Sequence, residues 1–183
     1  RVRVIVVGAG VIGAAVADAL AARGVEVVVL EMRSPGRGAS HASAGILAPF
    51  TEAQAGSPLL ALGRRSLDLY DDFVTSAADR SGRSIEYARS GTLEIAEDGA
   101  RADHLRTAHA WLTREGVPSE WLDRSALAAF EPRVSESAVG GLFIGTHGLV
   151  GVQALVQALL LSARFAGAVL AAPVEVVSVV PRG

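Results

Sequence analysis

The chain has 183 residues, half of them apolar and 20% charged, and its 17 cationic residues against 19 acidic ones give a formal net charge of −2. This composition is typical of a globular chain of one domain or slightly more, and it provides no basic surface for nucleic acid or for an anionic membrane. Because the sequence contains neither cysteine nor lysine, it excludes disulfides, thiolate metal sites, thiol nucleophiles and lysine Schiff bases.

The first thirty residues have the pattern of a β-α-β unit. Val2–Val7 is a nearly continuous β-branched run, typical of a strand buried on both faces of a parallel sheet. The glycine-rich turn Gly8–Gly13 follows at once, and the Ala- and Leu-rich stretch Ala14–Arg23 predicts a helix. Val25–Leu30 predicts a second buried strand, so the unit has the length expected of this motif.

The rest of the chain predicts alternating helices and strands. Residues 34–49 are rich in Gly, Ala and Ser, which predicts a loop whose backbone can approach a ligand closely. Apolar spacing predicts helices over 58–78, 100–115, 123–130 and 152–165. Strands are predicted over 138–144 and 174–180, with two short ones within 84–97. No uncharged apolar run reaches about 18 residues, so we expect no membrane span and a cytoplasmic protein.

Three glycines in the first turn form a dinucleotide-binding fingerprint. Gly8, Gly10 and Gly13 stand between strand and helix, and Glu31 ends the next strand, 18 residues beyond Gly13. The first glycine permits the tight turn, the second admits a pyrophosphate and the third allows close helix–strand packing, while the helix N-terminus attracts phosphate. Glu31 would accept hydrogen bonds from ribose hydroxyls and disfavours a 2′-phosphate, a point that the nearby Arg33 leaves open. The alternative is a doubly wound unit that binds no dinucleotide.

The fingerprint then extends into a family resemblance. Ala17 and Gly24 continue the glycine pattern in a form that resembles the FAD-binding version of this turn. Gly38–Pro49, with the sequence Gly-Ala-Ser-His-Ala-Ser-Ala-Gly-Ile-Leu-Ala-Pro, resembles the flavin-proximal segment of the glycine oxidase and D-amino-acid oxidase superfamily. The likeness extends over essentially the whole chain and includes Gly148–Val150.

The resemblance implies an α/β fold and a division of the chain. A Rossmann-like FAD-binding domain would take residues 1–84 and 135–183, and part of an inserted α+β substrate domain would take residues 85–134. It also implies the FAD contacts: a pyrophosphate turn, an adenosine end, a linker, a segment bordering the isoalloxazine ring and a backbone contact to adenine. The pyrophosphate turn is Gly8, Gly10, Val11, Ile12 and Gly13, and the adenosine end is Glu31 and Met32. The pyrophosphate and its linker contact Ala39 and Ser40, the isoalloxazine ring is bordered by Ala44, Gly45 and Ile46, and adenine contacts the backbone of Val174.

The histidines carry weaker signals. Some relatives attach FAD through a histidine one position closer to the glycine than His41, so we expect His41 to lie beside the cofactor, with a covalent link as the alternative. His104 and His109 are five residues apart, which does not match a helical metal pair, and we expect no metal site. His147 stands at a strand end without a recognisable partner. No catalytic residue can be named, since the family's Tyr and Arg carboxylate clamps have no counterpart in this chain.

The function implied by the resemblance is FAD-dependent oxidation of glycine or another small amine or D-amino acid. A hydride would pass from Cα to the flavin, the imine would hydrolyse, and O₂ would reoxidise the flavin to give hydrogen peroxide. Within the family, glycine oxidation supplies thiazole synthesis for thiamine. Family members are roughly twice this long, so we expect an N-terminal fragment of a full-length protein that forms homo-oligomers.

Two alternatives stay open. One is a D-amino-acid or sarcosine dehydrogenase that passes electrons to an acceptor other than oxygen. The other is an inactive fragment that folds only with a partner chain or by self-association, because strand 174–180 would leave an unpaired edge.

Overall fold

The structure, a computed structural model, describes residues 3–52 and 57–181. Its contacts divide the chain into two compact units. The first unit consists of Arg1–Ile46, Leu62–Tyr87 and Val150–Gly183, and the second of Leu47–Ala61 and Ala88–Leu149. The chain therefore passes between the units several times.

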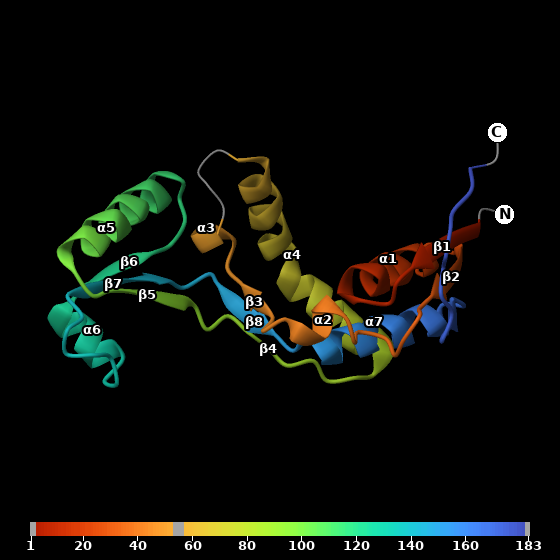
Figure 1. Cartoon of the computed structure of the whole chain (residues 1–183). Coiled ribbons are helices and arrows are strands. Elements are labelled where there is room, and N and C mark those ends of the chain that lie inside the picture. The colour runs from red at the N-terminus through yellow and green to blue at the C-terminus, as the bar shows by residue number, and fades with distance from the viewer. Residues whose placement is uncertain (1–2, 53–56, 182–183) are drawn as a thin grey trace. The chain divides into compact units, whose positions relative to one another are not determined.

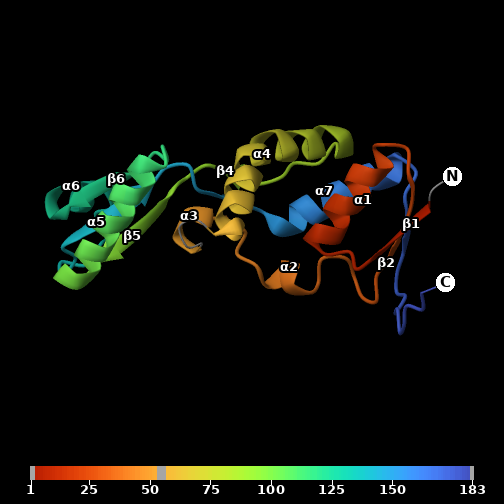
Figure 2. The ribbon, with the colours of Figure 1, turned by 90° about the horizontal axis from the view of Figure 1, so that it is seen from above.

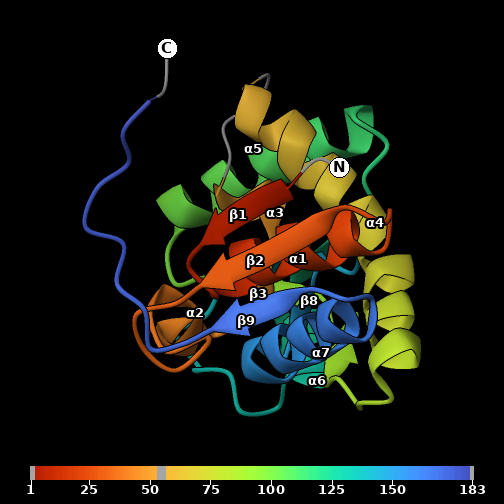
Figure 3. The ribbon, with the colours of Figure 1, turned by 90° about the vertical axis from the view of Figure 1, so that its right-hand side faces the viewer.

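The first unit is built on a parallel sheet. Strands β1 (Arg3–Val7), β2 (Glu26–Leu30) and β9 (Val169–Ala171) pair in the order β1-β2-β9, as Figure 3 shows face-on. Behind the sheet in that view lie helices α1 (Val11–Ala21) and α7 (Val152–Phe165), which pack side by side (Figure 2). The α/β fold class is confirmed, with a parallel sheet and crossover helices as the β-α-β pattern predicts.

The two faces of this sheet differ. Side chains that point toward the helices are buried, and Val27 and Val29 are each 1% exposed. Side chains on the other face are open: Ile5 is 58% exposed and Val7 is 60% exposed. The expectation that the first strand is buried on both faces is therefore wrong for the part of the chain that the structure describes, because α1 and α7 cover one face only.

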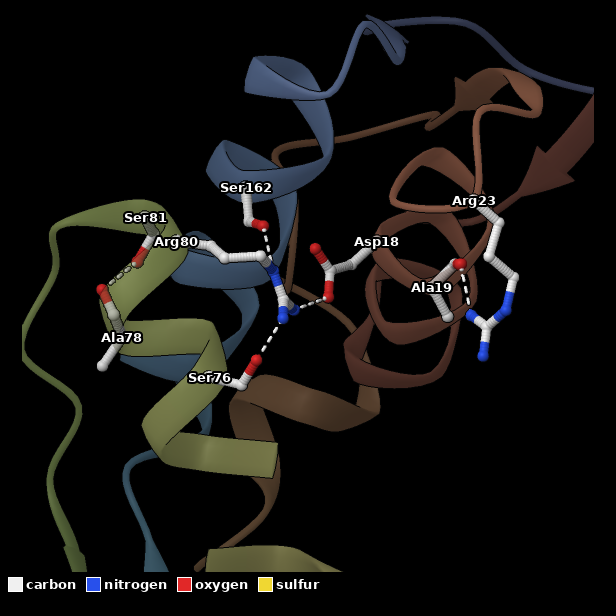
Figure 4. A network of polar contacts seen from close by, with 8 residues as sticks. All are labelled: Asp18, Ala19, Arg23, Ser76, Ala78, Arg80, Ser81 and Ser162. Carbon is white, nitrogen blue, oxygen red and sulfur yellow. Dashed lines mark hydrogen bonds and ion pairs between the residues drawn. The ribbon is translucent and has the colours of Figure 1, made fainter. Parts of the chain in front are cut away.

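A buried ion pair ties α1 to α4 (Pro58–Ser81), as Figure 4 shows. Asp18 of α1 is 3% exposed, and its Oδ2 accepts from the guanidinium of Arg80 near the end of α4. The Arg80 Nε also donates to Ser162 Oγ of α7 at 3.0 Å, and a second guanidinium nitrogen contacts Ser76. One guanidinium thus joins three helices of the first unit.

The second unit is built on an antiparallel sheet. Strands β5 (Thr92–Ala96), β7 (Gly140–Ile144) and β6 (Glu120–Asp123) pair in the order β5-β7-β6. Helix α5 (Gly99–Arg114) lies along one face, as Figure 1 shows, and α6 (Arg124–Phe130) packs on the other. The core under α5 contains Ala96, Ala102, Leu105, Leu112, Val117, Leu142 and Ile144, with Phe50, Trp111 and Trp121 packed against it.

Short elements mark the places where the chain passes from one unit to the other. Strands β3 (Ile46–Leu47), β8 (Gly148–Val150) and β4 (Tyr87–Ala88) form a small sheet in the order β3-β8-β4. Helices α2 (Ala39–Ala42) and α3 (Pro49–Glu52) are single turns on either side of β3.

The predicted strand over 174–180 is wrong. The strand that pairs with β2 is instead β9, Val169–Ala171, which the sequence analysis did not predict. Pro173 follows and has no N–H to donate to a further strand. Residues 174–181 are irregular, and the side chain of Val177 is 87% exposed. A β-branched run forms a strand only where a neighbour offers hydrogen bonds, and among the described residues none lies beside this run. Strands β3, β6 and β8 and the single-turn helices α2 and α3 were not predicted either.

Candidate functional site

The glycine turn leads directly from β1 into α1. Gly8 has φ +97°, which a side chain would disfavour, and its N–H donates to Leu30 O at 2.8 Å. The N-cap of α1 is Gly10, which makes no side-chain cap. The helix starts its own hydrogen bonding with Ala14 N–H to Gly10 O at 2.9 Å, so the N–H groups of Ile12 and Gly13 make no bond within the helix and could meet a bound anion.

Gly10 and Gly13 are required for different reasons. A Cβ on Gly13 would lie 2.0 Å from Gly8 O, so only glycine lets the helix approach the turn this closely. A Cβ on Gly10 would meet only Ser40 Oγ, at 3.1 Å, and the space beside it is otherwise open. Gly13 therefore serves packing, whereas Gly10 leaves room for a ligand.

Glu31 anchors the same turn from the end of β2. Its Oε2 accepts the N–H of Ala9 at 2.7 Å, and its Oε1 accepts the N–H of Arg33 at 2.8 Å. The Ala9 hydrogen bond, together with that of Arg33 and the charge of Arg33, lowers the pKa of Glu31 despite partial burial. The carboxylate is thus ionised at neutral pH and keeps lone pairs that can accept from hydroxyl groups.

An open hollow lies next to Glu31. It has a volume of about 480 Å³ and is lined by Arg33, Ser34, Pro35, Ala172 and Pro173. Val174 follows this lining, and its N–H donates to Glu31 O at 2.7 Å. The structure therefore brings together Glu31 and Val174, two residues predicted to contact the adenosine part of FAD.

The loop segment with the small residues also reaches the turn. Ser40 of α2 accepts the N–H of Val11 at 2.9 Å, so the predicted linker contact lies at the N-terminus of α1. His41 is exposed, and its Nε2 lies 3.4 Å from a guanidinium nitrogen of Arg37.

Gly45 makes the tightest contact of this segment. It has φ +73°, and a Cβ there would lie 2.0 Å from Val150 O. The N–H of Val150 donates to Gly45 O at 2.9 Å, which fixes the two backbones together. Ala44, Gly45 and Ile46 therefore form a second group of the predicted residues, held against Val150 and next to a hollow of about 360 Å³ whose lining includes Ser40, His41, Ser43 and Ala44.

Sequence reasoning missed His147. It is fully buried, its Nδ1 lies 2.7 Å from Thr92 Oγ1 and its Nε2 accepts the N–H of Phe50 at 3.3 Å. Burial, and secondarily the charge of Arg89, lowers its pKa to about 4. Its partners are 55 and 97 positions away, so no local pattern could have revealed it.

Among the residues that the structure describes, no group of three or more histidine and acidic side chains is placed to hold a metal ion. His109 contacts Ser119, with 2.9 Å between Nδ1 and Oγ. Every helix in residues 3–52 and 57–181 is too short or too polar to cross a membrane.

Comparison with known proteins decides the family. The sequence profile of the FAD dependent oxidoreductase family matches residues 3–183. The chain belongs to this family. The resemblance expected from the sequence is therefore confirmed, and FAD is the cofactor of the family.

The chain is similar to glycine oxidases. It is 34% identical to the glycine oxidase of Geobacillus kaustophilus over 171 residues, which cover 93% of this chain and 45% of that protein. The crystal structure of a Geobacillus kaustophilus glycine oxidase superposes with a TM-score of 0.90 at 34% identity, over 96% of this chain and 48% of that one. The bifunctional protein ThiO/ThiG of a Nostoc species is 32% identical over 90% of this chain and 24% of its own length. The chain thus spans less than half the length of these relatives.

The residues present fit an FAD. Gly10 leaves space at the N-terminus of α1, where N–H groups can meet a pyrophosphate. The ionised Glu31, which follows β2 and binds the N–H of Ala9, offers oxygen atoms that can accept from ribose hydroxyls. The open hollow beside Arg33 lies in sequence and space next to that carboxylate.

Proposed function

We propose that this chain provides the FAD-binding part of an oxidase that acts on glycine or another small amine. The observation that carries the proposal is the joint geometry of the glycine turn and Glu31. The turn leaves the N-terminus of α1 accessible beside Gly10, and the Glu31 carboxylate holds the turn through Ala9. The similarity to glycine oxidases supports the substrate class.

We propose the following contacts to the cofactor. The glycine turn and Ser40 would bind the pyrophosphate, Glu31 with Met32 and Val174 would bind the adenosine end, and Ala44 to Ile46 would border the isoalloxazine ring. The complete set is Gly8, Gly10, Val11, Ile12, Gly13, Glu31, Met32, Ala39, Ser40, Ala44, Gly45, Ile46 and Val174. His41 would lie beside the cofactor without a covalent bond, and its contact with Arg37 is compatible with that role.

The protein's own contribution is to bind and orient. FAD, when bound, supplies the hydride acceptor and the path to oxygen. Ser40, which accepts from Val11 N–H in the structure, would donate its hydroxyl proton to a phosphate oxygen. The rigid Gly45–Val150 contact would hold the backbone beside the ring in one position.

The proposed division of the chain follows the family. Residues 1–84 and 135–183 would form the FAD-binding domain, and residues 85–134 would belong to the substrate domain. The relative named ThiO/ThiG supports a place in thiazole synthesis for thiamine, with glycine as the substrate.

The test is anaerobic reduction of the FAD-loaded full-length protein, because the family's carboxylate-binding Tyr and Arg have no counterpart in this chain. Glycine, sarcosine and D-alanine are added in turn, and the visible absorbance of the flavin is followed before and after air is admitted. We expect glycine to bleach the flavin and air to restore its colour with release of hydrogen peroxide. Bleaching without peroxide would favour the dehydrogenase alternative, and no bleaching with any of the three amines would overturn the proposal. Free FAD with the same amines is the control.

A further inference from the structure

A buried histidine holds a short helix of the second unit. His147 lies between β7 and β8 and is 0% exposed. Its ring stacks on Phe50 of α3, with centroids 5.3 Å apart and planes inclined by 13°. Its Nε2 accepts the N–H of Phe50 at 3.3 Å, and its Nδ1 contacts Thr92 Oγ1 at 2.7 Å. Both ring nitrogens and one ring face are therefore engaged.

The hydrogen bonds define the protonation of this ring. A backbone N–H can only donate, so Nε2 of His147 must be without a proton. The neutral ring then carries its proton on Nδ1 and donates it to Thr92 Oγ1. Because burial and the charge of Arg89 keep the pKa near 4, the ring stays neutral at physiological pH and remains an acceptor for Phe50.

The segment that His147 holds has a defined place along the chain. Phe50 lies in α3, four residues after Ile46, and its side chain packs against the core under α5. The preceding residues, Ala44 to Ile46, are the proposed border of the isoalloxazine ring. Only residues 47–49 separate Ile46 from Phe50, and each residue spans at most about 3.6 Å. A displacement of the Phe50 backbone would therefore move the backbone that leads back to Ile46.

We propose that His147 is a positioning residue for α3, which fixes the backbone of Phe50 and thereby the segment that follows the flavin border. The positioning itself stands on the contacts of the second unit alone. Its consequence for the segment after the proposed flavin border, Ala44 to Ile46, rests on the proposed function.

The test compares two conservative variants by amide hydrogen exchange at Phe50. In His147→Gln the side-chain oxygen takes a place close to that of Nε2, whereas in His147→Asn it takes a place close to that of Nδ1 and cannot reach Phe50. We expect exchange at Phe50 to rise about tenfold in His147→Asn and to stay near the original rate in His147→Gln. His109→Gln is the matched control, since His109 lies in the same unit and contacts Ser119 without touching α3.

Equal exchange rates at Phe50 in the Asn and Gln variants would overturn the proposal, whether both are fast or both unchanged, because only the acceptor position differs between them. Circular dichroism verifies that each variant is folded. Exchange at Phe50 does not depend on flavin, so failure of the proposed function would leave that result intact.

Discussion

Replacing Arg80 should damage the fold more than replacing its partner Asp18. The Asp18 side chain is 4% exposed, and its Oδ1 has no hydrogen-bond partner among the described residues. Arg80→Ala would therefore leave a buried carboxylate with neither charge partner nor hydrogen bond from the guanidinium. Asp18→Ala instead leaves a guanidinium that is 40% exposed, still reaches water and keeps its bond to Ser162.

The magnitude follows from this asymmetry. Removing one partner of a fully buried ion pair costs about 3–5 kcal/mol. Because water screens part of the Arg80 guanidinium, we expect Arg80→Ala to lower the free energy of unfolding by about 2–3 kcal/mol. Asp18→Ala should cost about 1 kcal/mol, the net value of the lost hydrogen bond. The double variant should cost less than the sum of the two, with a coupling of about 1 kcal/mol.

Urea unfolding followed by circular dichroism measures these differences. Arg23→Ala is the matched control, since Arg23 lies in the turn that follows α1 and its guanidinium donates to the local carbonyl of Ala19 (Figure 4). This control should change the free energy of unfolding by less than about 0.5 kcal/mol. The reasoning is refuted if Arg80→Ala behaves like the control, or if Asp18→Ala costs more than Arg80→Ala.

Three further predictions concern the site and its surroundings. Gly45→Ala should lower the stability by more than about 2 kcal/mol in thermal unfolding, because it combines a strained φ with a collision against Val150 O; an unchanged Tm would contradict the geometry. Stability should fall as the pH is lowered from 6.5 toward 4, by up to about 3 kcal/mol, since unfolded His147 takes up a proton in this range and folded His147 does not. His147→Gln should flatten that decline, and an equal slope in both proteins would refute the assignment. Glu31→Gln should weaken FAD binding in equilibrium titration, because its amide group would present a donor to the N–H of Ala9 or Arg33; equal affinity would show that the carboxylate charge is not needed.

Local signals were sufficient to predict the strand–turn–helix on which the candidate site is built. The positions of Gly8, Gly10 and Gly13 define a strand–turn–helix without reference to the rest of the chain, and Glu31 follows at the spacing that a β-α-β unit imposes. The longer helices were predicted as well, since apolar periodicity within one segment reports the face that is buried, whereas the single turns α2 and α3 are too short for such a signal. Ser40 was assigned to the pyrophosphate by resemblance, and its bond to Val11 places it at the same turn.

Features that depend on distant partners could not be predicted. The run over 174–180 has the residues of a strand, but pairing with β2 takes place at Val169–Ala171, where Ala and Gly neighbours weaken the signal. In the sequence, Asp18 is only one acidic residue in an apolar helix. Its partner Arg80 is 62 positions away, so no local pattern indicates the ion pair. His147 likewise gains its role only when the fold brings Thr92 and Phe50 to its two nitrogens.

The absorbance spectrum of the purified chain, compared with that of Gly10→Val, measures whether the glycine turn holds FAD. Gly10 has φ −74°, and a Cβ there would meet only the hydroxyl of Ser40, so the variant should fold while its side chain fills the path of the pyrophosphate. We predict a yellow chain with the bands of oxidised flavin and a folded but colourless Gly10→Val protein. Undiminished flavin in Gly10→Val, or a folded wild-type chain that takes up no FAD when the cofactor is supplied in excess, would contradict the account.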